Sequence, residues 1–117
     1  MKLILIQQDD SNHAGTTEVN EKFVIDGKPT YDTWVTESFP VEGEMKTGLC
    51  TMQPGAMTIR NYPTDEVFTL VSGKFEITNE DGSAVVMSPG ESALIKKGWS
   101  GTWRNVEKST KYYTSVG

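Results

Sequence analysis

The chain of 117 residues has one cysteine and one histidine, and each scarcity excludes a class of site. With Cys50 alone, no internal disulfide or cysteine-based metal site can form, and the absence of disulfides fits a reducing compartment. Cys50 lies in an apolar stretch, so we expect a small buried side chain. His13 lies in a polar stretch and is expected at the surface, because a lone imidazole brings no further metal ligands.

Clustered positive charge and long apolar runs are also missing. The formal net charge is -5, the sequence pI is about 4.8, and the lysines and arginines are scattered, which argues against a nucleic-acid partner. The apolar start, Met1–Ile6, is too short for a signal-peptide core or a membrane span. We therefore expect a soluble, cytoplasmic protein with no nucleic-acid or membrane partner.

Apolar residues nowhere recur at helical spacing over a useful length. Short alternating segments separated by turn residues predict β-strands instead, and the polar stretch 9–20 is expected to be an exposed loop. The expected strands are 3–8, 23–26, 31–37, 45–53, 56–62, 66–72, 74–79, 84–87, 93–96, 102–106 and 111–116. This pattern predicts one all-β sandwich or barrel domain over residues 1–117, with its core at about 45–116 and N-terminal strands and a loop at 1–44.

Two Pro-Gly turns, Pro54-Gly55 and Pro89-Gly90, each start an alternating strand, so residues 54–105 repeat one plan twice. Glu66 is followed after six residues by Gly73. The second half keeps a fixed spacing of Gly90, Lys96, Gly98, Gly101 and Asn105. This layout resembles the two motifs of the cupin superfamily, with Lys96 where the pattern has proline. The resemblance implies a double-stranded β-helix, or jelly-roll barrel.

Most cupins hold a divalent metal with three histidines and a glutamate, and this chain departs from that pattern. Asn61, Pro63 and Gly101 stand at the histidine positions, and only Glu66 remains. Imidazole is a far better ligand for transition metals than these residues, so we expect no such metal and no cofactor. A hard cation held by Glu66, Asp65 and the Asn61 carbonyl is left open.

A closer resemblance is to small single-domain cupins, largely of unknown function, that are related to ureidoglycine aminohydrolase and to an ethanolamine-utilisation protein. It covers about residues 47–116. It rests on Thr47-Gly48-Leu49, Tyr62 before Glu66-Val67, Glu80-Asp81-Gly82, Gly98-Trp99-Ser100-Gly101-Thr102-Trp103 and Lys111-Tyr112-Tyr113. These elements are specific for the fold and weak for activity, because the named enzymes depend on ligands absent here.

In the cupin register, alternation places one set of side chains inside the barrel: Met57, Ile59, Asn61, Glu66, Phe68, Leu70, Gly101, Trp103 and Asn105. Such an apolar interior with a few polar groups is typical of a small-ligand site. The candidate ligand-binding residues are Asn61, Tyr62, Glu66, Phe68, Lys96 and Trp103.

Several of these residues have a structural alternative. Glu66 is either a general acid or base or a carboxylate salt-bridged to Lys96, Arg60 or Lys111. Trp103 is either core packing or a stacking platform, and Tyr62 either lies at the mouth or on the surface. For Lys111 and Tyr113 we favour an ion pair and a packed aromatic side chain over catalysis.

Three functions compete. The first is metal-independent binding of a small polar metabolite in the barrel. The second is an enzyme of nitrogen or carboxylate metabolism that uses Glu66 in aminohydrolase-like or other acid–base chemistry. The third is a non-catalytic dimerisation module, in which a homodimer exchanges the strand Leu3–Ile6 between its subunits.

Overall fold

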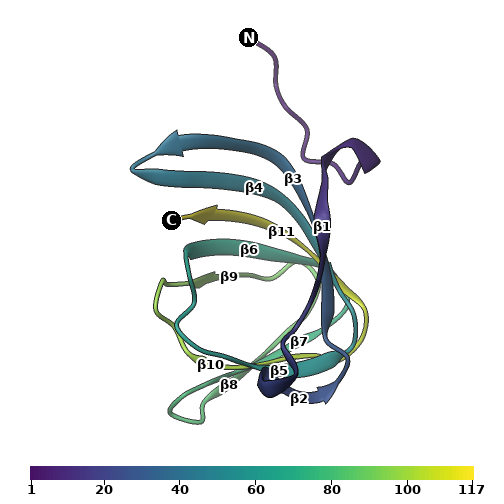
Figure 1. Ribbon diagram of the computed structural model, residues 1–117, viewed down its shortest axis with the longest axis vertical. Helices are drawn as coiled ribbons and strands as arrows, with labels where there is room; N and C mark the ends of the chain where they lie inside the picture. The colour runs from purple at the N-terminus through teal and green to yellow at the C-terminus, as the bar shows by residue number, and fades with distance from the viewer.

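A computed structural model describes all residues 1–117, and eleven β-strands make up most of the chain (Figure 1). The strands are β1 (His13–Glu18), β2 (Val24–Gly27), β3 (Thr30–Val41), β4 (Gly43–Met52), β5 (Gly55–Ile59), β6 (Asp65–Ser72), β7 (Phe75–Asn79), β8 (Ala84–Met87), β9 (Ser92–Ile95), β10 (Gly101–Asn105) and β11 (Ser109–Val116). The only helices are two 3-10 turns, η1 (Asp10–Asn12) and η2 (Glu21–Phe23). Neither has the length or apolar character needed to cross a membrane.

The strands form two antiparallel sheets that curve around a shared interior (Figure 1). The first sheet has the order β1-β3-β4-β11-β6-β9, and the second has the order β2-β5-β10-β7-β8. Consecutive strands pair in β3–β4 and β7–β8, but other neighbours come from distant parts of the chain, as β11 does between β4 and β6. The predicted all-β jelly-roll architecture of the cupin type is therefore confirmed.

Alternating side chains explain why the central strands form where the sequence predicts them. In β6, Glu66, Phe68 and Leu70 are buried while Asp65 and Val67 are exposed. Their period of two sends one set of side chains into the barrel and the other to its outer surface.

Three aromatic rings lie at the centre of the core. Phe68 and Phe75 pack edge to face with ring centroids 6.1 Å apart, and Trp103 lies 5.4 Å from the first and 4.9 Å from the second. Full burial of each phenylalanine contributes about 2–3 kcal/mol to folding. Of the three rings, Trp103 also lines the cavity described below.

The N-terminal region differs from the sequence prediction in two ways. Residues 3–8 form no strand and lie exposed, whereas the expected loop 9–20 contains η1 and the edge strand β1. All six residues of β1 are exposed, so it has no apolar alternation that a sequence pattern could reveal. It forms through backbone pairing with β3, and the Asp32 carboxylate of β3 contacts the Thr16 hydroxyl and His13 Nε2.

Another difference from the sequence prediction concerns the end of β5. The strand was expected to continue to residue 62, but it ends at Ile59. Asn61 adopts a left-handed backbone conformation, with φ 55°, which a strand cannot accommodate. Its side chain is therefore exposed and does not share the inner face with Met57 and Ile59, as the alternation predicted.

Candidate functional site

A cavity of about 490 Å³ lies between the two sheets. Its walls are mostly apolar and include Tyr31, Met52, Met57, Ile59 and Trp103. The segment that runs from β1 to η2 lines it as well, through Thr17, Glu18, Val19, Asn20 and Phe23. The polar side chains Tyr62, Glu66 and Lys111 lie together on its inner surface.

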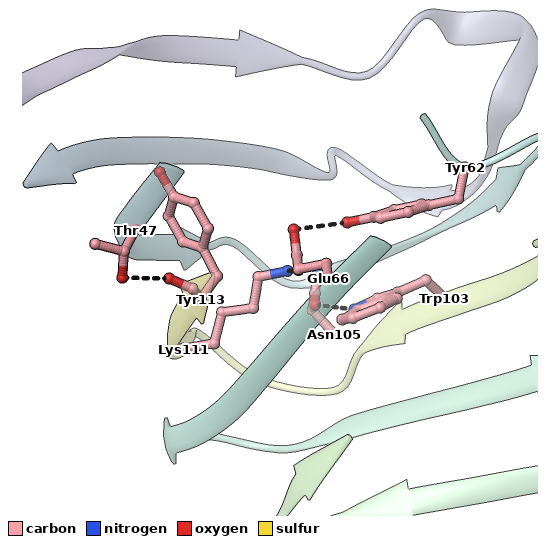
Figure 2. A network of polar contacts seen from close by, with 7 residues as sticks. All are labelled: Thr47, Tyr62, Glu66, Trp103, Asn105, Lys111 and Tyr113. Carbon is pink, nitrogen blue, oxygen red and sulfur yellow. Dashed lines mark hydrogen bonds and ion pairs between the residues drawn. The ribbon is translucent and has the colours of Figure 1, made fainter. Parts of the chain in front are cut away.

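Glu66 and Lys111 form a buried ion pair at this surface (Figure 2). The Lys111 Nζ atom lies 2.6 Å from Glu66 Oε2, and the two side chains are 8% and 9% exposed. Tyr62 donates its hydroxyl to the other carboxylate oxygen, Glu66 Oε1, at 3.1 Å. Burial of a charge is costly unless the charge is paired and hydrogen-bonded, and both carboxylate oxygens meet this condition.

The ammonium of Lys111 also lies beside two aromatic rings. Its Nζ atom is 4.8 Å from the ring centroid of Phe68 and 5.1 Å from that of Trp103, within the usual range of cation–π contacts. Trp103 is held in place because its Nε1 donates to Asn105 Oδ1 at 2.9 Å. Strand register brings the set together, since β11 pairs with β6 and β10 pairs with β5 and β7.

Burial and charge shift the pKa values of several groups here. Burial raises the pKa of Tyr62 to about 12, and the Glu66 carboxylate adds to this rise. Burial alone would lower the pKa of Lys111, but the Tyr62 phenolate that exists at high pH and the Glu66 carboxylate together raise it above its ordinary value. Tyr62 is therefore a neutral hydroxyl and Lys111 a charged ammonium at neutral pH.

The donor set does not fit the metal that most cupins carry. Nowhere in the chain do three or more His, Cys, Asp or Glu side chains gather as ligands. Of the residues at the metal-ligand positions, Asn61 is exposed and Glu66 already binds the Lys111 ammonium. The space beside Gly101 is occupied by the ring of Trp99. The Glu66 carboxylate, which a metal ion would need as a ligand, is thus already paired with the Lys111 ammonium.

The predicted site residues fall into three groups. Tyr62, Glu66 and Trp103 line the large cavity together. Phe68 and Lys96 instead line a second cavity of about 420 Å³, formed mainly by β7, β8 and β9. Asn61 lines neither cavity. Among the three candidate cations, the one that pairs with Glu66 is Lys111, and no ion pair joins Glu66 to Lys96 or Arg60.

The cavity walls that come from residues before position 53 were not predicted from the sequence. The segment 17–23 gave no signal because it is polar and pairs only at a sheet edge. The inward direction of Lys111 had no clear signal in the sequence either. In β11 the buried residues Ser109, Lys111 and Ser115 are polar while Tyr112 and Val116 are exposed, so apolar alternation does not identify the inner face of this strand.

Comparison with known proteins identifies relatives of the same fold. A protein of unknown function from Pseudomonas syringae, of the DUF861 family, is 17% identical with a TM-score of 0.75, over 88% of this chain and 45% of its own. This chain thus spans less than half the length of that relative. The EutQ protein of Clostridium difficile is 18% identical with a TM-score of 0.65, over 95% and 80% of the two chains.

An acetylacetone dioxygenase from Acinetobacter johnsonii is also similar, at 17% identity and a TM-score of 0.68, over 100% of this chain and 76% of its own. None of the curated proteins compared with the chain matches it significantly. The family model of the EutQ-like cupin domain matches residues 41–113, which is more than half of the sequence. The chain therefore belongs to the family of EutQ-like cupin domains.

Proposed function

We propose that this protein binds a small molecule in the 490 Å³ cavity without the help of a metal ion. The observation that carries the proposal is the buried network of Glu66, Lys111 and Tyr62 in the wall of an otherwise largely apolar cavity. Apolar walls supply affinity for the body of a ligand, and a few fixed polar groups supply its orientation. Cavities of this kind in other proteins span roughly 300–1,000 Å³, so the volume suits a small metabolite.

A screen of small metabolites by thermal shift, followed by two-dimensional NMR, tests this function. Ligands should perturb signals from cavity residues such as Met57 and Ile59, and Glu66→Gln should weaken their binding. The matched control is Glu76→Gln, at an exposed residue of β7 that lines neither cavity. Binding that is unchanged in Glu66→Gln would mean that the assigned site is wrong.

An enzyme of nitrogen or carboxylate metabolism remains the second candidate, with Glu66 as general acid or base. The geometry supports it less, because both oxygens of this carboxylate already accept hydrogen bonds. Elemental analysis of protein purified without chelators separates the candidates. A stoichiometric metal would favour the enzyme and count against metal-independent binding.

We also propose that the protein forms a homodimer through its N-terminal segment. Leu3, Ile4, Leu5 and Ile6 are exposed by 39% to 90% and pair with no strand of their own chain. Four consecutive exposed apolar side chains gain from burial against a partner. Strand exchange with a second copy would bury them.

A further inference from the structure

The Lys111 ammonium has fewer hydrogen-bond acceptors than N–H donors. It carries three N–H donors, yet its one hydrogen-bond partner in the structure is Glu66 Oε2. Its side chain is only 8% exposed, and its Nζ atom also lies beside the rings of Phe68 and Trp103. Buried donors are nearly always paired, so an ammonium with spare N–H groups beside a cavity indicates a place for an acceptor oxygen.

The charges around the Lys111 ammonium cancel one another. The Glu66 carboxylate balances Lys111, and the third polar group of the set, Tyr62, is a neutral hydroxyl because burial raises its pKa to about 12. The two charged residues that line the cavity elsewhere, Glu18 and Lys46, are exposed and of opposite sign. A ligand with a net charge would thus be buried without compensation, which is costly.

The remaining walls favour an apolar body. Met52, Met57 and Ile59 face the cavity together with Tyr31 and Trp103. None of these side chains carries a charge, and the Trp103 Nε1–H is already bonded to Asn105. The uncharged polar side chains Thr17, Asn20, Thr33 and Thr58 also line the cavity, but most of its surface is apolar. The ligand is therefore expected to be largely apolar, with an acceptor oxygen near Lys111.

We propose that the Lys111 ammonium takes the place of the cupin metal ion and binds the carbonyl-type oxygen of a neutral, largely apolar ligand, such as a ketone or an amide. This inference rests on the proposed binding function and names its ligand class. Because Lys111 stays protonated, it donates hydrogen bonds and does not attack the carbonyl as a free amine.

The test compares four compounds with one aromatic skeleton: acetophenone, benzoate, benzylammonium and toluene. Binding is followed by two-dimensional NMR on the methyl signals of Met57 and Ile59 and the indole N–H signal of Trp103. We expect acetophenone to bind at least tenfold more tightly than the other three. Equal binding of toluene and acetophenone would overturn the role of Lys111.

Variants test the ammonium directly. The double variant Lys111→Met with Glu66→Gln removes both charges and leaves no lone buried ion, so it is expected to fold. It should bind acetophenone no more tightly than toluene. Lys96→Met, in the second cavity, is the matched control and should keep the wild-type preference. A double variant that folds and keeps the preference would refute the proposal. If the double variant does not fold, the order of the four compounds in the wild type still decides the ligand class.

The outcomes separate this inference from the proposed function. Preference for benzoate or benzylammonium would overturn the neutral ligand class and leave the binding function standing. The same holds if none of the four compounds binds but the metabolite screen finds a charged ligand in the cavity. If neither the four compounds nor the screen perturbs the cavity signals, both proposals fall.

Discussion

The indole ring of Trp99 occupies the space that a side chain at Gly101 would need. A Cβ atom at position 101 would lie 2.5 Å from Trp99 Cζ2 and would also collide with the carbonyl oxygen of Thr78. The ring is held there because Trp99 Nε1 donates to Asn79 Oδ1 at 2.9 Å. Position 101, where most cupins have a metal-binding histidine, is thus closed by packing.

Gly101→Ala is expected to lower the free energy of unfolding by about 1–3 kcal/mol, because added volume in a packed site forces its neighbours to shift. Urea denaturation measures the change. In a Trp99→Ala background the same substitution should cost less, since one of the two colliding groups is gone. An equal cost in both backgrounds would assign the clash to the Thr78 carbonyl alone.

Lys111→Met is expected to lower the free energy of unfolding by about 3–5 kcal/mol, because it leaves the buried Glu66 carboxylate without its cation. Adding Glu66→Gln removes the lone charge, so the double variant should recover part of that loss. Lys46→Met breaks an exposed pair and should cost about 1 kcal/mol or less, as the control. A Lys111→Met variant as stable as Lys46→Met would contradict a buried, paired ammonium.

Stability should fall as the pH rises above about 10. The pKa of Tyr62 is 10 in the unfolded chain and about 12 in the folded protein. The contribution of this shift to the free energy of unfolding is therefore complete below pH 10 and is lost as the pH rises through 12. Two pKa units correspond to about 2–3 kcal/mol. The raised pKa of Lys111 acts in the same direction, with loss beginning above its ordinary value of 10.5. Urea denaturation between pH 8 and 11.5 measures how steeply the free energy of unfolding falls with pH, and Tyr62→Phe should make this fall less steep. An equally steep fall in the variant would show that Tyr62 is not its cause.

The Cys50 thiol should react slowly in the native protein. Its residue is 7% exposed, and burial raises the pKa of the thiol, so little reactive thiolate forms. A disulfide reagent such as dithionitrobenzoate should modify it at least tenfold faster in denaturant than in buffer. As a control, a cysteine at the exposed position Ser83, in a Cys50→Ala background, should react at similar rates in both conditions.

Deletion of residues 1–8 tests the proposed homodimer. The deletion removes the exposed apolar side chains Leu3–Ile6 and should shift the protein towards monomer in sedimentation. The barrel should remain folded, because this segment pairs with no strand of its own chain. The matched control replaces only the polar residues Gln7 and Gln8 by serine and should sediment like the wild type. A dimer that survives the deletion would argue against exchange of this segment.

Much of the fold was predictable because its signals are local. The turn at Asp81-Gly82 and the strands on either side, at 75–79 and 84–87, were expected to within one residue. Alternation along 66–72 identified the inward side chains Glu66, Phe68 and Leu70. By contrast, β1 has no apolar face, and only its backbone pairing with β3 defines it.

The sequence by itself determined the strands from residue 24 onward and, through the cupin motif spacing, the jelly-roll class and the loss of the histidine ligands, because alternation, turn residues and motif spacing are properties of neighbouring residues. Only the tertiary structure decided that Glu66 pairs with Lys111, 45 positions away, and not with Lys96 or Arg60. That choice depends on the register between β6 and β11 and on the end of β9 at Ile95. The left-handed turn at Asn61 likewise removed from the barrel a residue that spacing had placed inside it.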